Sequence, residues 1–143
     1  MIQEIHIEKA STGLLEDGII QITFKSGKLI QPEDLWEIKR IDEELSGNKP
    51  YTVLVQAEEL ANFSVETRQL TASKEFKGLT IAKALLFEGL AQRIIVNFYM
   101  KVNMPYTKTK AFSEREKALE WLREEYQLFI SENKSVVSDE SAT

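Results

Sequence analysis

Several side chains that carry chemistry are absent or scarce in this chain of 143 residues. There is no cysteine, which excludes disulfides, thiol catalysis and zinc sites built on cysteine. The single histidine, His6, excludes metal sites with two histidine ligands and leaves little for histidine-based catalysis. No phosphate loop, dinucleotide-binding glycine pattern or G-x-S-x-G motif occurs. We therefore expect no enzyme activity, no cofactor and no metal.

Acidic residues outnumber basic residues, and the chain has no long apolar run. The net charge of −5 argues against nucleic-acid binding, and no run approaches the ~20 apolar residues of a membrane span. The N-terminus alternates apolar and polar residues, unlike a signal peptide, so we expect a cytoplasmic protein. Hydrophobic residues make up 43% of the chain, which is typical of a globular domain. We predict one domain over residues 1–130 and a flexible, polar C-terminal tail over 131–143.

The first half of the chain predicts antiparallel strands followed by a helix and a buried strand. Residues 4–8 and 20–25 alternate between apolar and polar side chains, which predicts antiparallel strands within residues 2–25. Asp17-Gly18 is a strong hairpin signal because both residues tolerate positive φ. Pro32 suits the first position of a helix, whose apolar stripe continues to Leu45. The short β-branched run 51–55 is typical of a central strand buried on both faces.

The second half alternates between helices and strands. The pattern predicts a helix over 64–76, an apolar strand over 79–87, a third helix over 89–103, a strand over 107–112 and a final helix after Ser113. Such alternation requires parallel strands joined by crossover helices. The fold class is therefore α/β, with a mixed sheet of about five strands, packed helices and an N-terminal antiparallel hairpin.

Several spaced motifs in residues 14–125 resemble a known family. They are the hairpin Asp17-Gly18-Ile19 to Phe24-Lys25 with Gly27, the run Arg93-Ile94-Ile95-Val96-Asn97-Phe98-Tyr99, the triplet Asn103-Met104-Pro105, Phe112, Glu116 with Ala118, and Trp121-Leu122. In these positions the chain resembles an uncharacterised bacterial branch of the STAS domains, often labelled STAS/SEC14-like. STAS is the fold of anti-sigma-factor antagonists.

That resemblance implies a regulatory module rather than an enzyme. Members of the broader superfamily bind protein partners, nucleotides or small ligands, and many are switched by phosphorylation in an Asp-Ser-x-Gly type motif. Here Ser64 falls where the motif has its Asp, Glu66 falls near its phosphorylated Ser, and the Gly is absent. We therefore predict that Ser64 caps the second helix and is not a phosphorylation switch.

The third helix carries two apolar stripes where a surface helix needs one. At 100° per residue we assign the larger stripe to the core: Ala91, Ile94, Ile95, Phe98 and Val102. The smaller stripe is Val96, Tyr99 and Met100, and a polar stripe of Arg93, Asn97 and Lys101 lies beside it. The smaller stripe could lie under the loop of Met104 and Pro105, form a self-association face, or line an apolar ligand pocket.

The same region is basic in an otherwise acidic chain. No Asp or Glu occurs between Glu88 and Glu114, and Lys108 and Lys110 alternate on a strand so that they share one face. This stretch could be a solvated face or a dock for an anionic group. The predicted binding residues are Arg93, Val96, Asn97, Tyr99, Met100, Lys101, Lys108 and Lys110.

Two functional hypotheses follow from these observations. The first is a non-catalytic regulatory module that binds a protein partner or a small ligand, with a homodimer as one form of the interface. The alternative is a carrier of a small amphiphilic anion such as a lipid or fatty acid. The regulator hypothesis predicts a flat exposed face, whereas the carrier hypothesis predicts a dry cavity under the third helix.

Overall fold

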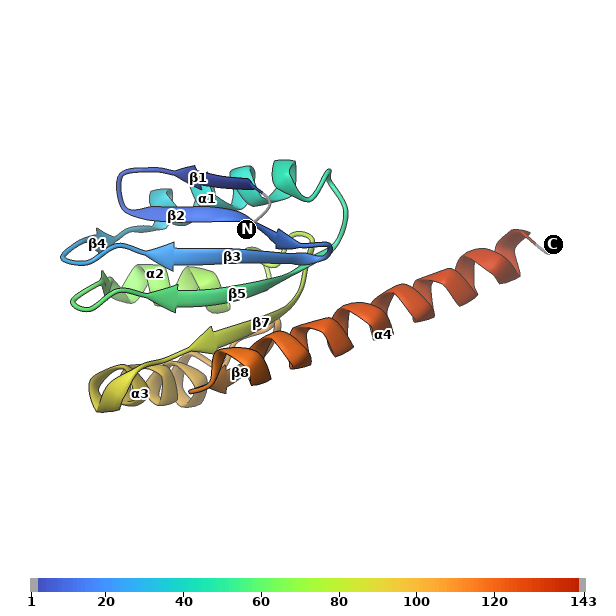
Figure 1. Ribbon diagram of the computed structural model, residues 1–143. Coiled ribbons are helices and arrows are strands. Elements are labelled where there is room, and N and C mark those ends of the chain that lie inside the picture. The colour runs from blue at the N-terminus through green and yellow to red at the C-terminus, as the bar shows by residue number, and fades with distance from the viewer. Residues whose placement is uncertain (1–2, 142–143) are drawn as a thin grey trace.

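One six-stranded mixed sheet organises the computed structural model, which describes residues 3–141 and the surroundings of side chains up to residue 133 (Figure 1). The first two strand pairings are antiparallel and the next three are parallel. The predicted mixed α/β sheet and its N-terminal hairpin are confirmed, with six strands instead of about five. In spatial order the strands are β1 (Gln3–His6), β2 (Ala10–Glu16), β3 (Ile19–Phe24), β5 (Tyr51–Ala57), β7 (Thr80–Leu86) and β8 (Lys108–Phe112).

The hairpin between β2 and β3 turns at Asp17-Gly18, as predicted. Gly18 has a φ of +82°, a conformation that residues with a Cβ rarely adopt. A Cβ at Gly18 would also lie 2.5 Å from the ring of Tyr126. The glycine therefore serves both the turn and the close approach of the last helix.

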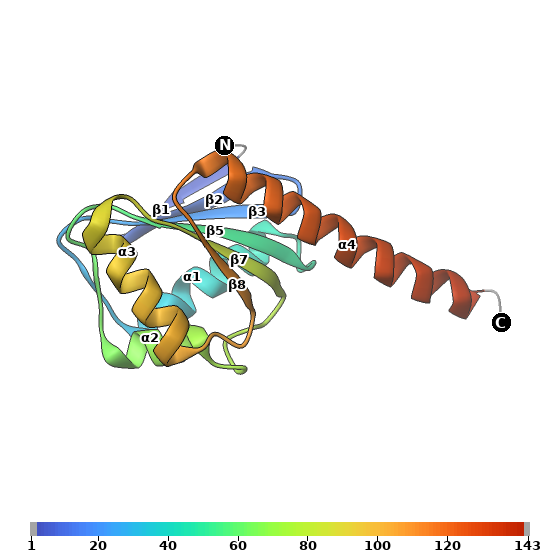
Figure 2. The same ribbon diagram turned by 90° about the horizontal axis from the view of Figure 1, so that it is seen from below.

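Helices cover both faces of the sheet (Figures 1 and 2). The last helix, α4, packs on one face and extends beyond the sheet, whereas the other helices lie on the opposite face. Two short strands, β4 (Leu29–Ile30) and β6 (Asn62–Phe63), form a separate parallel pair. The helical segments are α1 (Pro32–Leu45), α2 (Val65–Ala72), α3 (Gly89–Phe98), the π-helical turn η1 (Tyr99–Asn103) and α4 (Arg115–Ser141).

The core between α4 and the sheet is closely packed. Ile19, Leu54 and Leu122 are fully buried there, and small side chains at Ala82 and Ala84 let α4 approach β7.

Helix α1 begins at Pro32, as predicted, and α2 begins directly after Ser64. The side-chain oxygen of Ser64 accepts a hydrogen bond from the backbone N–H of Thr67 at 3.1 Å, which confirms the predicted N-cap. Thr67 in turn donates its hydroxyl to the backbone oxygen of Ile30 at 2.7 Å. The cap thus joins the start of α2 to the small β4–β6 pair.

The assignment of the larger apolar stripe on α3 to the core is wrong. Ile94, Phe98 and Val102 are 50–60% exposed, whereas Tyr99 from the smaller stripe is buried. Periodicity identifies two faces of a helix but does not say which face meets the sheet. No residue of α3 is fully buried, so this helix stands off the sheet and is held in place mainly through η1 and Tyr99.

The C-terminal segment continues α4 as far as Ser141. A domain boundary at residue 130 and a tail that is flexible in solution stay predictions. Residues 142 and 143 of that predicted tail lie outside the described residues.

Candidate functional site

A cavity of about 660 Å³ lies between the sheet and the helices on the α1 side. Its walls come from β3, β5 and β7 on one side and from α1, α2 and α3 on the other. Protein interiors are packed with few voids larger than a water molecule, and volumes of roughly 300–1,000 Å³ are typical of ligand sites. The walls are largely apolar, and include Ile22, Val53, Val55, Leu35, Ile38 and Ile95.

The position of α3 explains why this side of the sheet is incompletely filled. Figure 2 shows α3 crossing beside α2 on the side of the sheet opposite α4. Val96 and Tyr99 line the cavity together with Ala91 and Ile95 from the border of the larger stripe, while Ile94, Phe98 and Val102 do not line it and are at least half exposed. A helix that turned its larger stripe inward would fill the space with bulkier side chains.

Lys83 is the most unusual side chain in the cavity wall. It comes from the middle of β7, its residue is only 9% exposed, and its Nζ donates to the backbone oxygen of Thr71 at 2.8 Å and to Thr71 Oγ1 at 3.2 Å. It makes no ion pair with any residue from 3 to 133. Burial, and to a lesser extent the positive charge of Lys39, lowers the pKa of Lys83 to about 7.

Lys39 on α1 lines the same cavity. Its Nζ donates to Thr80 Oγ1 at 2.9 Å and to the backbone oxygen of Lys77 at 3.1 Å, and lies 4.5 Å from the centre of the Phe76 ring. Burial lowers the pKa of Lys39 to about 8, although Glu43 and Asp42 oppose that shift. Its ammonium is therefore better compensated than that of Lys83.

Two tyrosine hydroxyls add unused hydrogen-bonding capacity. Both Tyr51 and Tyr99 line the cavity, and the hydroxyl of each is buried without a hydrogen-bond partner among the described residues. The Tyr99 hydroxyl lies near the Thr71 side chain, which is also the partner of Lys83. Burial raises the pKa of Tyr99 to about 12, so the hydroxyl stays protonated and can donate to a ligand.

An acidic group also borders the cavity. Asp42 is 2% exposed and its Oδ1 accepts a hydrogen bond from Thr12 Oγ1 at 2.5 Å. Burial raises the pKa of Asp42 to about 7, with the hydrogen bond from Thr12 opposing the shift. This carboxyl therefore belongs to the α1–β2 contact and is a weak counter-ion near neutral pH.

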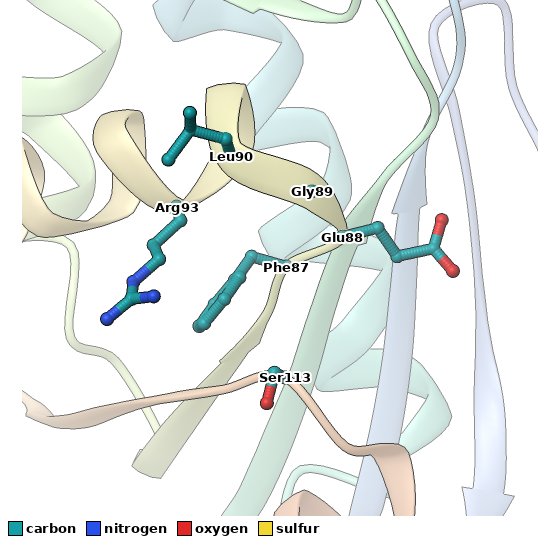
Figure 3. Close-up of a pocket in the computed structure, with 6 residues that line it drawn as sticks. All are labelled: Phe87, Glu88, Gly89, Leu90, Arg93 and Ser113. Atoms are coloured by element: carbon teal, nitrogen blue, oxygen red, sulfur yellow. The ribbon is translucent and has the colours of Figure 1, made fainter.

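A second, more open hollow lies where β7 and β8 end (Figure 3). Its residues are Phe87, Glu88, Gly89, Leu90, Arg93 and Ser113. In the figure the Arg93 side chain extends alongside Phe87, and the Glu88 carboxylate points away from both. Arg93 is therefore positioned at the rim of the sheet, apart from Lys83 in the large cavity.

The predicted binding residues are distributed over several surfaces. Val96 and Tyr99 line the large cavity, Arg93 lines the open hollow, and Met100 is half-buried on η1. Asn97 and Lys101 are exposed. The structure thus brings two of the eight predicted residues into one cavity.

The basic stretch is partly neutralised by acids from elsewhere in the sequence. Lys108 Nζ lies 2.7 Å from the Glu125 carboxylate of α4, a contact that the local absence of acids could not reveal. Lys110 Nζ lies 5.4 Å from the centre of the Phe112 ring. Both lysines are on β8, which is an edge strand of the sheet.

Sequence reasoning missed the polar groups that define the cavity, above all Lys83. One signal was available: Lys83 is the only charged residue in the apolar run Leu79–Phe87. A charge inside a buried strand is rare unless it is paired or functional. Lys39 and Thr71 carry no such signal, because polar residues are ordinary on helices.

The outer face of α3 and η1 carries a row of exposed apolar side chains. Leu90, Ile94, Phe98 and Val102 recur every fourth residue and are 50–72% exposed. The guanidinium of Arg68 lies 5.9 Å from the centre of the Phe98 ring. We call these four residues the outer stripe.

Neither a metal centre nor a membrane span is found in the described part of the chain. No group of three or more His, Asp or Glu residues there is placed to hold a metal ion. None of its helices is both long and apolar enough to cross a bilayer.

Comparison with known proteins establishes the fold and the family. A crystal structure of an uncharacterized protein of the DUF3478 family from Shewanella loihica PV-4, described as having a SpoIIAA-like fold, matches with a TM-score of 0.52 and 16% sequence identity. The match covers 84% of this chain and 98% of that one, and it confirms the STAS-like fold. No curated protein matches. The family model "Domain of unknown function (DUF7793)" matches residues 14–126, and the chain belongs to that family.

Proposed function

We propose that this domain is a non-catalytic, STAS-like regulatory module that binds a small amphiphilic anion in the cavity beneath α3. One observation carries the proposal: an apolar cavity of about 660 Å³ contains a buried amine, Lys83, with no carboxylate partner among the described side chains. A cavity under the third helix is the feature that distinguishes the carrier hypothesis from a flat regulatory surface.

An amphiphilic anion would satisfy both parts of this cavity. Each methylene group that moves from water into the apolar part contributes ~0.8 kcal/mol. An anionic head would supply the counter-charge that Lys83 lacks, and a buried charge is far less costly when it is paired. The free hydroxyl of Tyr99 can donate a further hydrogen bond to that head.

Co-purified ligands and a defined probe test cavity binding. We expect native mass spectrometry to detect a small amphiphile on the purified protein, and calorimetry to detect decanoate binding after delipidation. Val55→Trp fills the cavity and should abolish decanoate binding, whereas Val65→Trp on the exposed start of α2 should leave it unchanged. Equal binding by both variants would place decanoate elsewhere and refute the proposal.

The role of Lys83 as the head-group partner is tested by comparing decanoate with decanol. Lys83→Met keeps a long apolar side chain but removes the amine. We expect this variant to lose at least ~10-fold in affinity for decanoate and little for decanol, because only the anion pairs with the amine. An unchanged preference for decanoate in Lys83→Met would contradict the assignment.

Partner binding through the outer stripe is a second candidate function. Four large apolar side chains at 50–72% exposure along one helix are unusual on a free surface and are typical of an interface. In a homodimer the outer stripes of two copies would meet across a two-fold axis. Arg93 and Lys101, two of the predicted binding residues, would lie beside the outer stripe on the same helical segment.

Oligomeric state tests this second candidate. We expect sedimentation analysis to give a dimer for the unmodified chain and a folded monomer for Phe98→Asp. Leu128→Asp, an equally exposed apolar position on α4, is the matched control and should leave the dimer intact. A monomeric unmodified chain at high concentration would rule out self-association through α3.

A further inference from the structure

The surroundings of Lys83 are those of a nucleophilic amine. Both hydrogen bonds of its Nζ go to Thr71, and no carboxylate among the described residues holds it as an ammonium. Lys39 from α1 adds a like charge that opposes protonation, and Asp42 is engaged by Thr12. With a pKa of about 7, the amine is largely neutral in mildly alkaline solution, whereas ordinary lysines are protonated.

We propose that Lys83 captures aliphatic aldehydes that enter the cavity by forming a reversible imine. The lone pair of neutral Nζ attacks the carbonyl carbon, and the carbonyl electron pair moves to oxygen. The proton that nitrogen loses ends on that oxygen, which gives a carbinolamine. The carbinolamine then loses its hydroxyl group and the remaining proton of Nζ as water. A C=N double bond forms between Nζ and the former carbonyl carbon in this step. One amine and one aldehyde thus give one imine and one water, with no oxidant or reductant.

The cavity favours this condensation in two ways. Its largely apolar walls keep water away from the C=N bond, and water is the reagent that reverses the reaction. The Tyr99 hydroxyl lies near Thr71, stays protonated and has no hydrogen-bond partner among the described residues. It can therefore donate a hydrogen bond to the carbonyl oxygen of the aldehyde, and later assist the departure of the carbinolamine's hydroxyl group. A desolvated lysine in an apolar pocket is an activated nucleophile for the same physical reasons.

This inference rests on the proposed function only in requiring that the cavity admit an alkyl chain. The two chemistries differ in the ligand head: a carboxylate pairs with an ammonium, whereas an aldehyde bonds to a neutral amine. Alkaline conditions should therefore weaken anion binding and favour the imine, and the two proposals can fail separately.

Reductive trapping tests the imine. The protein is incubated with decanal and cyanoborohydride at pH 7.5, and the hydride converts any imine into a stable secondary amine. We expect intact-mass analysis to show one decyl group per chain, and peptide mapping to place it on Lys83. Labelling at Lys83 should be at least ~10-fold faster than at exposed lysines, since only a small fraction of an ordinary lysine is neutral at this pH.

Variants and pH distinguish the proposal from non-specific labelling. Lys83→Arg should lose the fast adduct, while Lys28→Arg, at an exposed position outside the cavity, should retain it. The rate at Lys83 should level off above about pH 7, whereas rates at exposed lysines should keep rising. Adducts spread over exposed lysines at equal rates in the unmodified chain would overturn the proposal, whether or not any variant folds. If decanoate binding persists in that case, only the imine fails; if it is also absent, the proposed function fails with it.

Discussion

Replacing Lys83 by methionine should stabilise the ligand-free protein, and the gain should depend on pH. The folded chain lowers the pKa of Lys83 from 10.5 to about 7, mainly through burial. As pH falls from 10.5, the unfolded chain binds this proton before the folded chain does, so the folded state loses stability until pH reaches about 7. Below that pH the full penalty is present and no longer changes.

The size of the effect follows from the interval between the two pKa values. The full difference between the unfolded pKa of 10.5 and the folded pKa of about 7 corresponds to a loss of about 5 kcal/mol in the free energy of unfolding. Of this loss, about 3 kcal/mol develops between pH 9.5 and pH 7. Methionine has no proton to bind and packs well in irregular apolar space. The stability advantage of Lys83→Met over the unmodified chain should therefore be largest at pH 7 and should shrink by about 3 kcal/mol at pH 9.5.

Urea unfolding at several pH values measures this difference directly. Lys28→Met is the matched control, because Lys28 is exposed and its replacement should change stability by no more than ~0.5 kcal/mol at any of these pH values. A Lys83→Met protein that is less stable than the unmodified chain at pH 7 would refute the reasoning. So would a stability difference that does not vary with pH, because the amine would then be paired or solvated.

Three further outcomes test other parts of the structure. Asp42→Asn should stabilise the protein by about 4 kcal/mol at pH 8 and by almost nothing near pH 3.5, as urea melts at the two pH values would measure. The reason is that the raised pKa of Asp42 makes the folded state lose stability as pH rises from 3.8 to about 7. Leu122→Ala should cost ~2–5 kcal/mol in denaturant melts, since Leu122 is fully buried between α4 and the sheet, and a smaller loss than that of an exposed Leu128→Ala control would contradict the packing. Ser64→Ala should cost ~0.5–2 kcal/mol by removing the α2 cap, and stoichiometric phosphate on Ser64 or Thr67 in phosphoproteomics would show instead that the region is a switch.

Much of the fold could be predicted from local sequence because local physics determines it. Alternating apolar residues, the Asp17-Gly18 turn and Pro32 at a helix start each restrict a few neighbouring dihedral angles, and these elements occur where predicted. The order of helices and strands then limits the topology to parallel pairings after the hairpin. The cap at Ser64 also follows from neighbours within three residues.

The candidate site could not be predicted in the same way, because its residues meet only after long-range packing. Lys83, Thr71 and Lys39 come from three different elements, and nothing in the local sequence states that they line one cavity. The orientation of α3 is the decisive case. Its two apolar stripes are visible in the sequence, but which stripe faces the sheet depends on the free energy of the whole folded domain.

The sequence by itself therefore determined the order of the six sheet strands and four helices, the Asp17-Gly18 turn, the Ser64 cap and the amphipathic character of α3, since these depend on contacts within a few residues. It did not reveal the short β4–β6 pair or the π-helical turn η1. Only the tertiary structure decided that the smaller stripe faces the sheet and that Lys108 pairs with Glu125. It also decided that a buried amine in β7 borders an unfilled space. The physical reason is that burial, dielectric environment and cavity volume are properties of surfaces brought together from distant parts of the chain, and no short segment contains them.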